Sequence, residues 1–377
     1  MKVTTTVKNL LEGFKICART IKRKSPLPIL NFFHIHASDR LSLTASTLDN
    51  WSTVVDENAE IESVGAVCLT KSFLATLKTL PKSARITLEA DNGTAFATVG
   101  GDRFGIECLP AEEFPEVFLP TAGPQVEFEL PEGGMKTFLN QILVCVANSD
   151  ESRAVMTHVH GVWPEGRGDS IRFEATDGRR AVRLEVENYP ADDRFQTLFS
   201  RELFLQAEDV CNKKGQQLAR ISCQEGCNFF QVGNVTLGSR EGQGIFVNID
   251  KILNDLKPIH FYTVDRLQFI QTCKRLLSLP QEKTCPNAGR LNFSEGFLSI
   301  GVDPPGQPRT WNKIPCSNFD GCIRTDIGLN LAYAVEWAES LQTESLKFSI
   351  NTDRRPMEIS GMIIMPIALR EEAAVAA

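Results

Sequence analysis

The chain lacks the short motifs that mark the commonest nucleotide-binding and hydrolytic sites. It has neither a phosphate-binding loop ending in Gly-Lys-Ser/Thr nor a Gly-x-Ser-x-Gly nucleophile elbow. It also lacks an apolar run approaching the roughly 18 residues that a membrane-spanning helix needs. The first residues, Met1 to Lys8, do not have the basic-then-apolar pattern of a signal peptide. We therefore expect a cytoplasmic protein.

Positive charge is in short supply. There are 40 Lys and Arg residues against 47 Asp and Glu residues, so the net charge is −7. A protein that holds nucleic acid over its whole surface should be basic. Either DNA is not the partner, or the basic residues are concentrated on one surface while the rest of the protein is acidic.

Metal-ligand clusters are also missing. The eleven cysteines are scattered, and Cys223 and Cys227 lack a second ligand pair at zinc spacing. We expect buried free thiols. His34 and His36, like His158 and His160, alternate along a strand, but no carboxylate or cysteine cluster joins them locally. We expect surface or half-buried strand histidines and no metal. A hydrolase that uses these pairs with a metal remains a less favoured alternative, which metal analysis would test.

A repeat of about 130 residues organises the chain. One alternating strand pattern recurs at Leu41–Ala45, Ile171–Ala175 and Leu298–Val302. A second recurs at Arg85–Leu88, Arg220–Cys223 and Lys347–Ile350. Amphipathic helical patterns keep the same period, near Val7–Lys22, Lys71–Leu80, Gly134–Ala147, Arg201–Cys211, Val264–Leu279 and Asn330–Leu341. The pattern predicts an α+β fold with antiparallel sheets and helices on one face. We predict three domains, at residues 1–122, 123–255 and 256–377.

The first helical pattern has one apolar and one basic face. Leu10, Phe14, Cys17 and Ile21 form a stripe at helical spacing, and the basic stripe on the other side is Lys8, Lys15, Arg19 and Lys22. Further cations lie in or beside this and the later helices: Arg23, Lys24, Arg201, Lys213, Lys214, Arg266, Lys274 and Arg275. A solvated lysine face is the ordinary explanation for any one helix. Repeated basic faces favour sequence-independent contact with DNA phosphates.

Five segments, in this order, resemble the bacterial DNA polymerase III β subunit, the β sliding clamp. They are Ser25–Leu30, Leu109–Pro115, Ala147–Arg153, Ala175–Arg180 and Ile363–Leu369. Each is short, but together they span nearly the whole chain. The resemblance implies three similar domains per chain, each with two helices and two sheets. It also implies a head-to-tail dimeric ring with helices lining the hole, without catalysis or cofactor.

The resemblance further implies a groove that binds short linear motifs of the polymerase III catalytic subunit, the clamp loader, other polymerases and repair proteins. The matching positions are Val159, Thr176, Gly178, Arg180, Ile363, Met365, Pro366 and Leu369. A Met- and Pro-lined groove accepts varied side chains, and an arginine at its edge can hold a peptide carboxylate or carbonyl. By the same resemblance, Lys24, Asn148 and Ser149 are expected to lie near double-stranded DNA.

Two segments depart from the family pattern. Arg153 is followed by Ala154 and Val155, where clamps often have tyrosine, and Thr47–Asn50 replaces a usual Thr-Asp pair. These departures suggest a divergent clamp. The alternative function is a clamp paralogue, or a clamp-like scaffold, serving a plasmid, phage or repair system.

Overall fold

The computed structural model describes the chain except for residues 22–24, 26, 92, 121–124, 130–133, 149–153, 163–169, 188–195, 215–217, 295, 320–325, 352–354 and 370–377. It divides into two compact units. The first comprises Met1–Pro131, Val162–Ile171 and Val186–Gly242, and the second comprises Glu132–Gly161, Arg172–Glu185 and Gln243–Ala377. No helix in the described ranges is long and apolar enough to cross a membrane.

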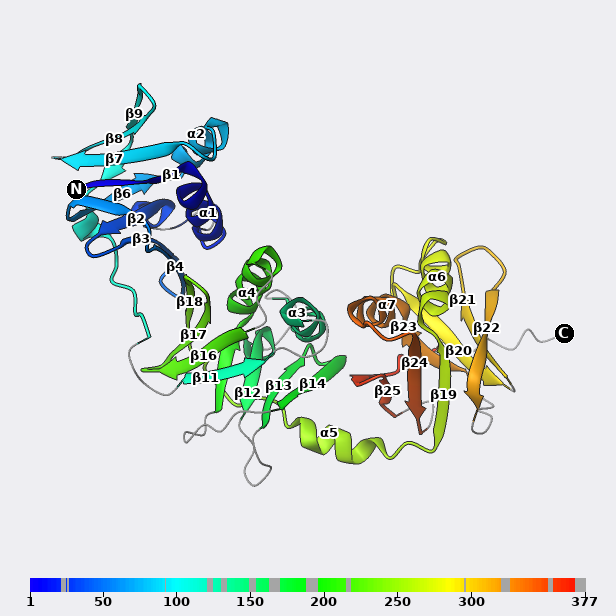
Figure 1. The fold of residues 1–377 in the computed structure, drawn as a ribbon. Coiled ribbons are helices and arrows are strands. Elements are labelled where there is room, and N and C mark those ends of the chain that lie inside the picture. Colours follow the sequence, from blue (N-terminus) through cyan, green and yellow to red (C-terminus); the bar gives the residue numbers. More distant parts are fainter. Residues whose placement is uncertain are drawn as a thin grey trace. The chain divides into compact units, whose positions relative to one another are not determined.

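The first unit contains two antiparallel sheets (Figure 1). In the five-stranded sheet the order is β5 (Glu60–Ser63), β1 (Lys2–Thr6), β7 (Arg85–Asp91), β8 (Thr94–Val99) and β9 (Asp102–Ile106). In the nine-stranded sheet the order is β10 (Cys108–Leu109), β6 (Gly65–Thr70), β2 (Phe32–Ala37), β3 (Leu41–Ser46), β4 (Asn50–Asp56), β18 (Val235–Arg240), β17 (Cys227–Val232), β16 (Leu218–Gln224) and β11 (Gln125–Glu129). The helices are α1 (Val7–Cys17), α2 (Phe73–Thr79) and α4 (Arg201–Lys214), and α4 follows β15 (Gln196–Ser200).

The second unit also consists of antiparallel strands and helices. Its hydrogen-bonded strands run in the order β12 (His158–Val162), β13 (Ser170–Thr176), β14 (Arg180–Glu187), β26 (Met362–Ile364), β25 (Met357–Ile359), β24 (Ser345–Ile350), β19 (His260–Asp265), β22 (Thr310–Phe319), β21 (Phe297–Val302), β20 (Ala288–Ser294) and β23 (Ile327–Asn330). The helices are α3 (Gly134–Val144), α5 (Ile249–Leu256), α6 (Arg266–Leu277) and α7 (Leu331–Ser340). Helix α5 was not predicted by the sequence pattern.

The predicted repeat is confirmed element by element. All six predicted strand segments are strands, as β3, β13 and β21 in one series and β7, β16 and β24 in the other. All six helical patterns contain helices. The first is shorter than predicted: α1 ends at Cys17, and the amides of Arg19 and Thr20 bond back in tight turns. The side chain of Thr20 lies 2.7 Å from the hydroxyl of Ser52, which ties this turn to the sheet.

A strand runs directly into a helix at four points of the chain. The last residue of the strand caps the helix, because its side-chain oxygen accepts a hydrogen bond from an amide in the first turn. The four capping residues are Thr6 before α1, Ser200 before α4, Asp265 before α6 and Asn330 before α7. This joint fixes the angle at which each helix leaves its sheet.

The cores are aromatic and lie between helices and sheets. In the first unit, the ring of Phe14 on α1 lies 4.5 Å from that of Phe33, measured between ring centroids. In the second unit, Tyr262 and Phe293 stack at 4.3 Å, and Phe348 packs beside Phe293. The predicted apolar stripe of α1 is confirmed, since Leu10, Phe14, Cys17 and Ile21 are all buried.

Two ladders join strands from different thirds of the chain. In the first unit β4 pairs with β18, with Val54 opposite Val235 and Trp51 opposite Gly238. A Cβ added to Gly238 would lie 2.1 Å from the Trp51 ring, so glycine is needed for this close approach. In the second unit β14 pairs with β26, with Val182 opposite Met362.

Candidate functional site

The turn between β13 and β14 is held by its own side chains. Asp177 Oδ1 accepts hydrogen bonds from the amides of Arg179 (2.8 Å) and Arg180 (2.9 Å). The hydroxyl of Thr176 donates to the carbonyl of Arg180 at 2.8 Å and accepts from the amide of Gly178. Gly178 has φ +86°, a conformation that glycine adopts without strain. Asp177 is therefore a turn residue, as the sequence favoured.

The guanidinium of Arg180 is surrounded on several sides. Its Nε donates to Asp177 Oδ2 at 3.1 Å, and Nη1 donates to Glu336 Oε2 at 2.7 Å. The guanidinium carbon of Arg180, Cζ, lies 4.0 Å from the centroid of the Tyr333 ring, which is a cation–π arrangement. Arg179, which is exposed, donates to the hydroxyl of Tyr333 at 3.2 Å. Arg180 is only 9% exposed, so its charge is neutralised within the protein.

The C-terminal segment runs beside this turn. Ile363 is buried in β26, whereas Met365 is 44% exposed and Pro366 is half-buried. The amide of Met365 donates to the carbonyl of Arg179 at 2.8 Å, which places Met365 next to the turn. The amide of Ile367 donates to the carbonyl of Gly328 at 3.0 Å. An arginine edge, an aromatic ring and an exposed methionine therefore meet at one surface.

Two of the predicted pocket residues, Val159 and Leu369, are not at the surface beside the Asp177 turn. Val159 is completely buried on β12, so its side chain does not reach a surface in this structure. Leu369, with Asp303 and Arg309, lines a pocket of about 680 Å³ beside β20 and β21. The structure therefore brings Thr176, Gly178, Arg180, Met365 and Pro366 together more closely than these two.

Three residues near the turn were missed in the sequence. Tyr333 and Glu336 are one turn apart on α7 and both contact Arg180. Met156 lies next to the turn, since a Cβ added to Gly178 would be 3.5 Å from the Met156 sulfur. The spacing of Tyr333 and Glu336 puts them on one face of a helix. Nothing in the sequence links that face to Arg180, 153 positions from Tyr333.

The predicted basic residues are in varied surroundings. Lys8 and Lys15 are exposed on α1. Arg19 pairs with Asp209 of α4 through Nε at 2.5 Å. On α6, Lys274 pairs with Glu339, Arg275 donates to the Thr272 hydroxyl at 3.1 Å, and Arg266 donates to the carbonyls of Thr343 and Ala338. Lys8 and Lys15 are thus the clearest candidates for contact with an external anion.

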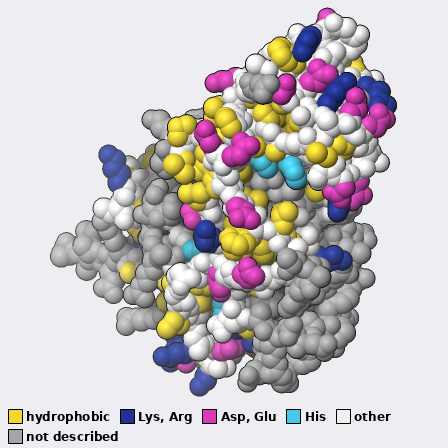
Figure 2. All heavy atoms as spheres, turned by 90° about the vertical axis from the view of Figure 1, so that its left-hand side faces the viewer, with side chains coloured by type: hydrophobic (Ala, Val, Ile, Leu, Met, Phe, Trp, Pro, Cys, Tyr) yellow, Lys and Arg dark blue, Asp and Glu magenta, His cyan; other side chains and the backbone are white. Residues whose placement is uncertain are grey.

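The remaining predicted DNA contacts are less informative. Asn148 is exposed, and Arg201 is half-buried at the start of α4. Lys213 and Lys214 lie in the last turn of α4, but their side chains are not described. Lys22, Arg23, Lys24 and Ser149 lie outside the described residues. On the face shown in Figure 2, Lys and Arg side chains are interspersed with acidic and hydrophobic ones.

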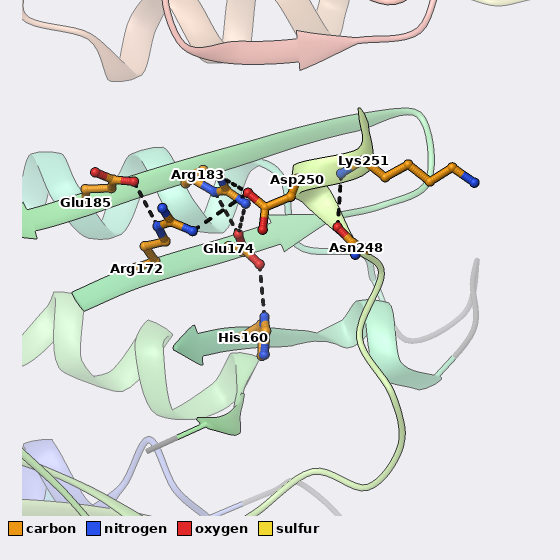
Figure 3. Close-up of polar contacts among 8 residues, drawn as sticks. All are labelled: His160, Arg172, Glu174, Arg183, Glu185, Asn248, Asp250 and Lys251. Carbon is orange, nitrogen blue, oxygen red and sulfur yellow. Dashed lines mark hydrogen bonds and ion pairs between the residues drawn. The ribbon is translucent and has the colours of Figure 1, made fainter. Parts of the chain in front are cut away.

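A charged network that was not foreseen from the sequence joins β12, β13 and β14 to α5 (Figure 3). Arg180 and Arg183 are three positions apart on β14, so strand alternation puts this network on the opposite face from Arg180. Glu174 Oε1 accepts from Arg183 Nε at 2.7 Å, and Glu174 Oε2 lies 3.0 Å from His160 Nδ1. Arg183 Nη1 also donates to Asp250 of α5 at 2.8 Å, and Arg172 Nε donates to Glu185 at 2.9 Å. The network therefore ties the start of α5 to the sheet.

The histidine and cysteine expectations can now be compared with the structure. His34 is half-buried and stacks on Phe114 at 5.1 Å, and burial, with neighbouring His36, lowers its pKa. The expectation is wrong for His160, which is buried against Glu174 and stacks on Phe246 at 4.8 Å. The ten described cysteines are free. Burial raises the pKa of Cys145 to about 12, so this thiol is protonated at neutral pH. The described residues contain no cluster of three His, Cys, Asp or Glu side chains arranged for a metal.

Known proteins that are similar to this chain over 98% of its length are sliding clamps. Residues 1–118 match the family model of the DNA polymerase III beta subunit, N-terminal domain. The chain is 25% identical to the beta sliding clamp of Synechococcus elongatus over 390 aligned positions, which cover 98% of this chain and 100% of that protein. Crystal structures of the polymerase III subunit beta from Pseudomonas aeruginosa and of the sliding clamp from Bacillus subtilis each superpose with a TM-score of 0.88. Each is 20% identical to this chain, and each comparison covers 98% of this chain and 100% of the other.

Antiparallel sheets with helices in this arrangement make the protein a DNA clamp by fold. Over its whole length the chain is similar to the bacterial β sliding clamps, and its first 118 residues match the DNA polymerase III β subunit family model. Its function is that of a processivity factor in DNA replication, and it is not an enzyme.

Proposed function

We propose that two copies of this clamp close head to tail into a ring that encircles duplex DNA without reading its sequence. The observation that carries the proposal is the repeated ladder between thirds of the chain, β4 with β18 and β14 with β26. In both ladders a strand from the earlier third, β4 or β14, pairs with the last strand of the following third, β18 or β26. We infer three domains, 1–122, 123–255 and 256–377, each joined to its neighbour in this way.

The same kind of strand pairing can join this chain to a second copy. β22 follows β20 and β21 as β4 follows β2 and β3, and β9 follows β7 and β8 as β18 follows β16 and β17. Among the described strands β9 has a partner only in β8, and Thr310–Pro315 of β22 pairs only with β21. Exposed strand edges are templates for pairing with another chain. We infer that β9 of one copy pairs with β22 of the other, twice, to close the ring.

The test of this proposal is topological. The protein should stay on closed circular DNA after loading by a clamp loader and should leave the same DNA once it is linearised. Light scattering after size exclusion should give a dimer. Equal loss from circular and linear DNA would contradict the ring, and a stable monomer would favour a clamp-like scaffold.

We infer that the basic face of α1 contacts DNA phosphates. Replacing Lys8 and Lys15 by Gln should weaken binding to a short duplex and make the salt dependence shallower. Each lost phosphate contact removes about 0.9 from the slope of log K against log salt, so the slope should change by about 2. Fluorescence anisotropy at several salt concentrations measures this. Lys2→Gln is the control, because Lys2 lies on β1 and pairs with Glu62 at 2.8 Å; an equal change in slope for both proteins would argue against this assignment.

The surface beside the Asp177 turn supports a peptide-binding role. Its proposed residues are Thr176, Gly178, Arg180, Ile363, Met365, Pro366, Leu369 and Val159, of which Val159 has the least support because it is buried. Partners would be the catalytic subunit of polymerase III, the clamp loader, and other polymerases and repair proteins that carry short linear motifs. We place this activity in the cytoplasm.

A further inference from the structure

The proposed peptide site holds a positive charge that is already neutralised. A ligand oxygen that approaches the engaged edges of the Arg180 guanidinium must compete with Asp177 or with Glu336. Asp177 is fixed, because its Oδ1 also caps the turn through the amides of Arg179 and Arg180 and its side chain is 14% exposed. Glu336 has no such second role in its described contacts, and its side chain is 51% exposed.

We propose that Glu336 is a built-in competitor for Arg180, and that the peptide group which replaces it is a carboxylate. The proposal rests on the peptide-binding role proposed above. Tyr333 covers one face of the guanidinium and Asp177 holds its Nε. The existing bond that a competing group can replace is therefore the one from Nη1 to Glu336. A carboxylate is the group that best matches this edge, because an ionised oxygen binds a guanidinium more strongly than a neutral oxygen does.

Exchange at this edge has a definite physical consequence. Glu336 is 51% exposed and Asp177 stays bonded to the buried Arg180, so Glu336 can turn into solvent at a modest cost. The incoming carboxylate must nevertheless displace one negative charge and then lie near it. Glu336 therefore sets how strongly the site distinguishes acidic from neutral peptide groups. Glu336 determines specificity by competing with the ligand for Arg180, without binding the ligand itself.

The experiment uses the full-length clamp and a fluorescent peptide of the C-terminal tail of the polymerase III catalytic subunit. The peptide is compared with versions in which each acidic group is neutralised in turn, by Asp→Asn, by Glu→Gln or by C-terminal amidation. In Glu336→Gln, the unmodified peptide should bind about two- to fivefold more tightly. One neutralised version should lose this gain, and it should also be the version whose effect disappears in Arg180→Gln.

Glu339→Gln is the matched control. Glu339 lies on the same helix one turn from Glu336, but it pairs with Lys274 instead of Arg180. It should bind every peptide as the wild type does. Equal affinities for wild type and Glu336→Gln, or an equal gain in Glu339→Gln, would overturn the competitor role. Failure of the wild-type ring to bind the tail peptide at all would count against the proposed peptide site itself.

Discussion

Glu174→Ala is expected to lower the free energy of unfolding by about 3–5 kcal/mol, the usual cost of removing one partner from a buried ion pair. Glu174 is 5% exposed, and both of its oxygens are engaged, by Arg183 and by His160. Without it, the partner left to Arg183 among the described residues is Asp250, whose side chain is 60% exposed. The Arg183 side chain, 12% exposed, would then have lost its buried counter-charge, and the cost of its desolvation would no longer be offset.

Urea denaturation followed by circular dichroism measures this loss. Glu185→Ala is the control, because Glu185 is in the same network but is 46% exposed and bonds only to Arg172 among the residues drawn in Figure 3. It should cost less than about 1 kcal/mol, as surface pairs do. Hydrogen exchange should also quicken at α5 in Glu174→Ala, since Asp250 ties that helix to the sheet through Arg183. Similar stabilities for the two variants would show that the network is not a main stabilising feature.

The double variant Met365→Ala with Pro366→Ala should weaken binding of a polymerase tail peptide by about 10- to 100-fold. Met365 is 44% exposed beside Arg179 and Arg180, so it offers an apolar surface that a peptide can cover. Loss of a few central apolar contacts typically costs 2 kcal/mol or more in binding. Calorimetry with the wild-type and variant clamps measures the change.

The ring should remain intact in this variant. Neither residue lies in β9 or β22, the two strands that we infer to join the copies. Light scattering should therefore give the same mass for both proteins. Unchanged peptide affinity in a correctly assembled variant would count heavily against the pocket, whereas loss of the dimer would show that these residues act through assembly.

The sequence predicted the repeat because local patterns carry it. Strands such as Leu41–Ala45 and Leu298–Val302 alternate apolar and other residues with a period of two, and α1 shows a clear apolar stripe. These periods depend on neighbours along the chain, so they can be recognised without tertiary information. The turn at Asp177 was predicted for the same reason, since its hydrogen bonds span at most four residues.

The partner of each charged side chain could not be predicted in this way. Arg172 and Glu174 alternate with Ile171 and Phe173, a pattern typical of a strand with one solvent-facing side, yet both are buried.

What the sequence by itself determined is the order, the type and the threefold repetition of the helices and strands. Only the tertiary structure decided that Arg180 is neutralised by Glu336, that Asp250 of the unpredicted helix α5 completes the network on the other face of β14, and that Val159 is buried. Charges attract across any separation in sequence, and their partners are chosen by the packing of distant segments, which no local period records.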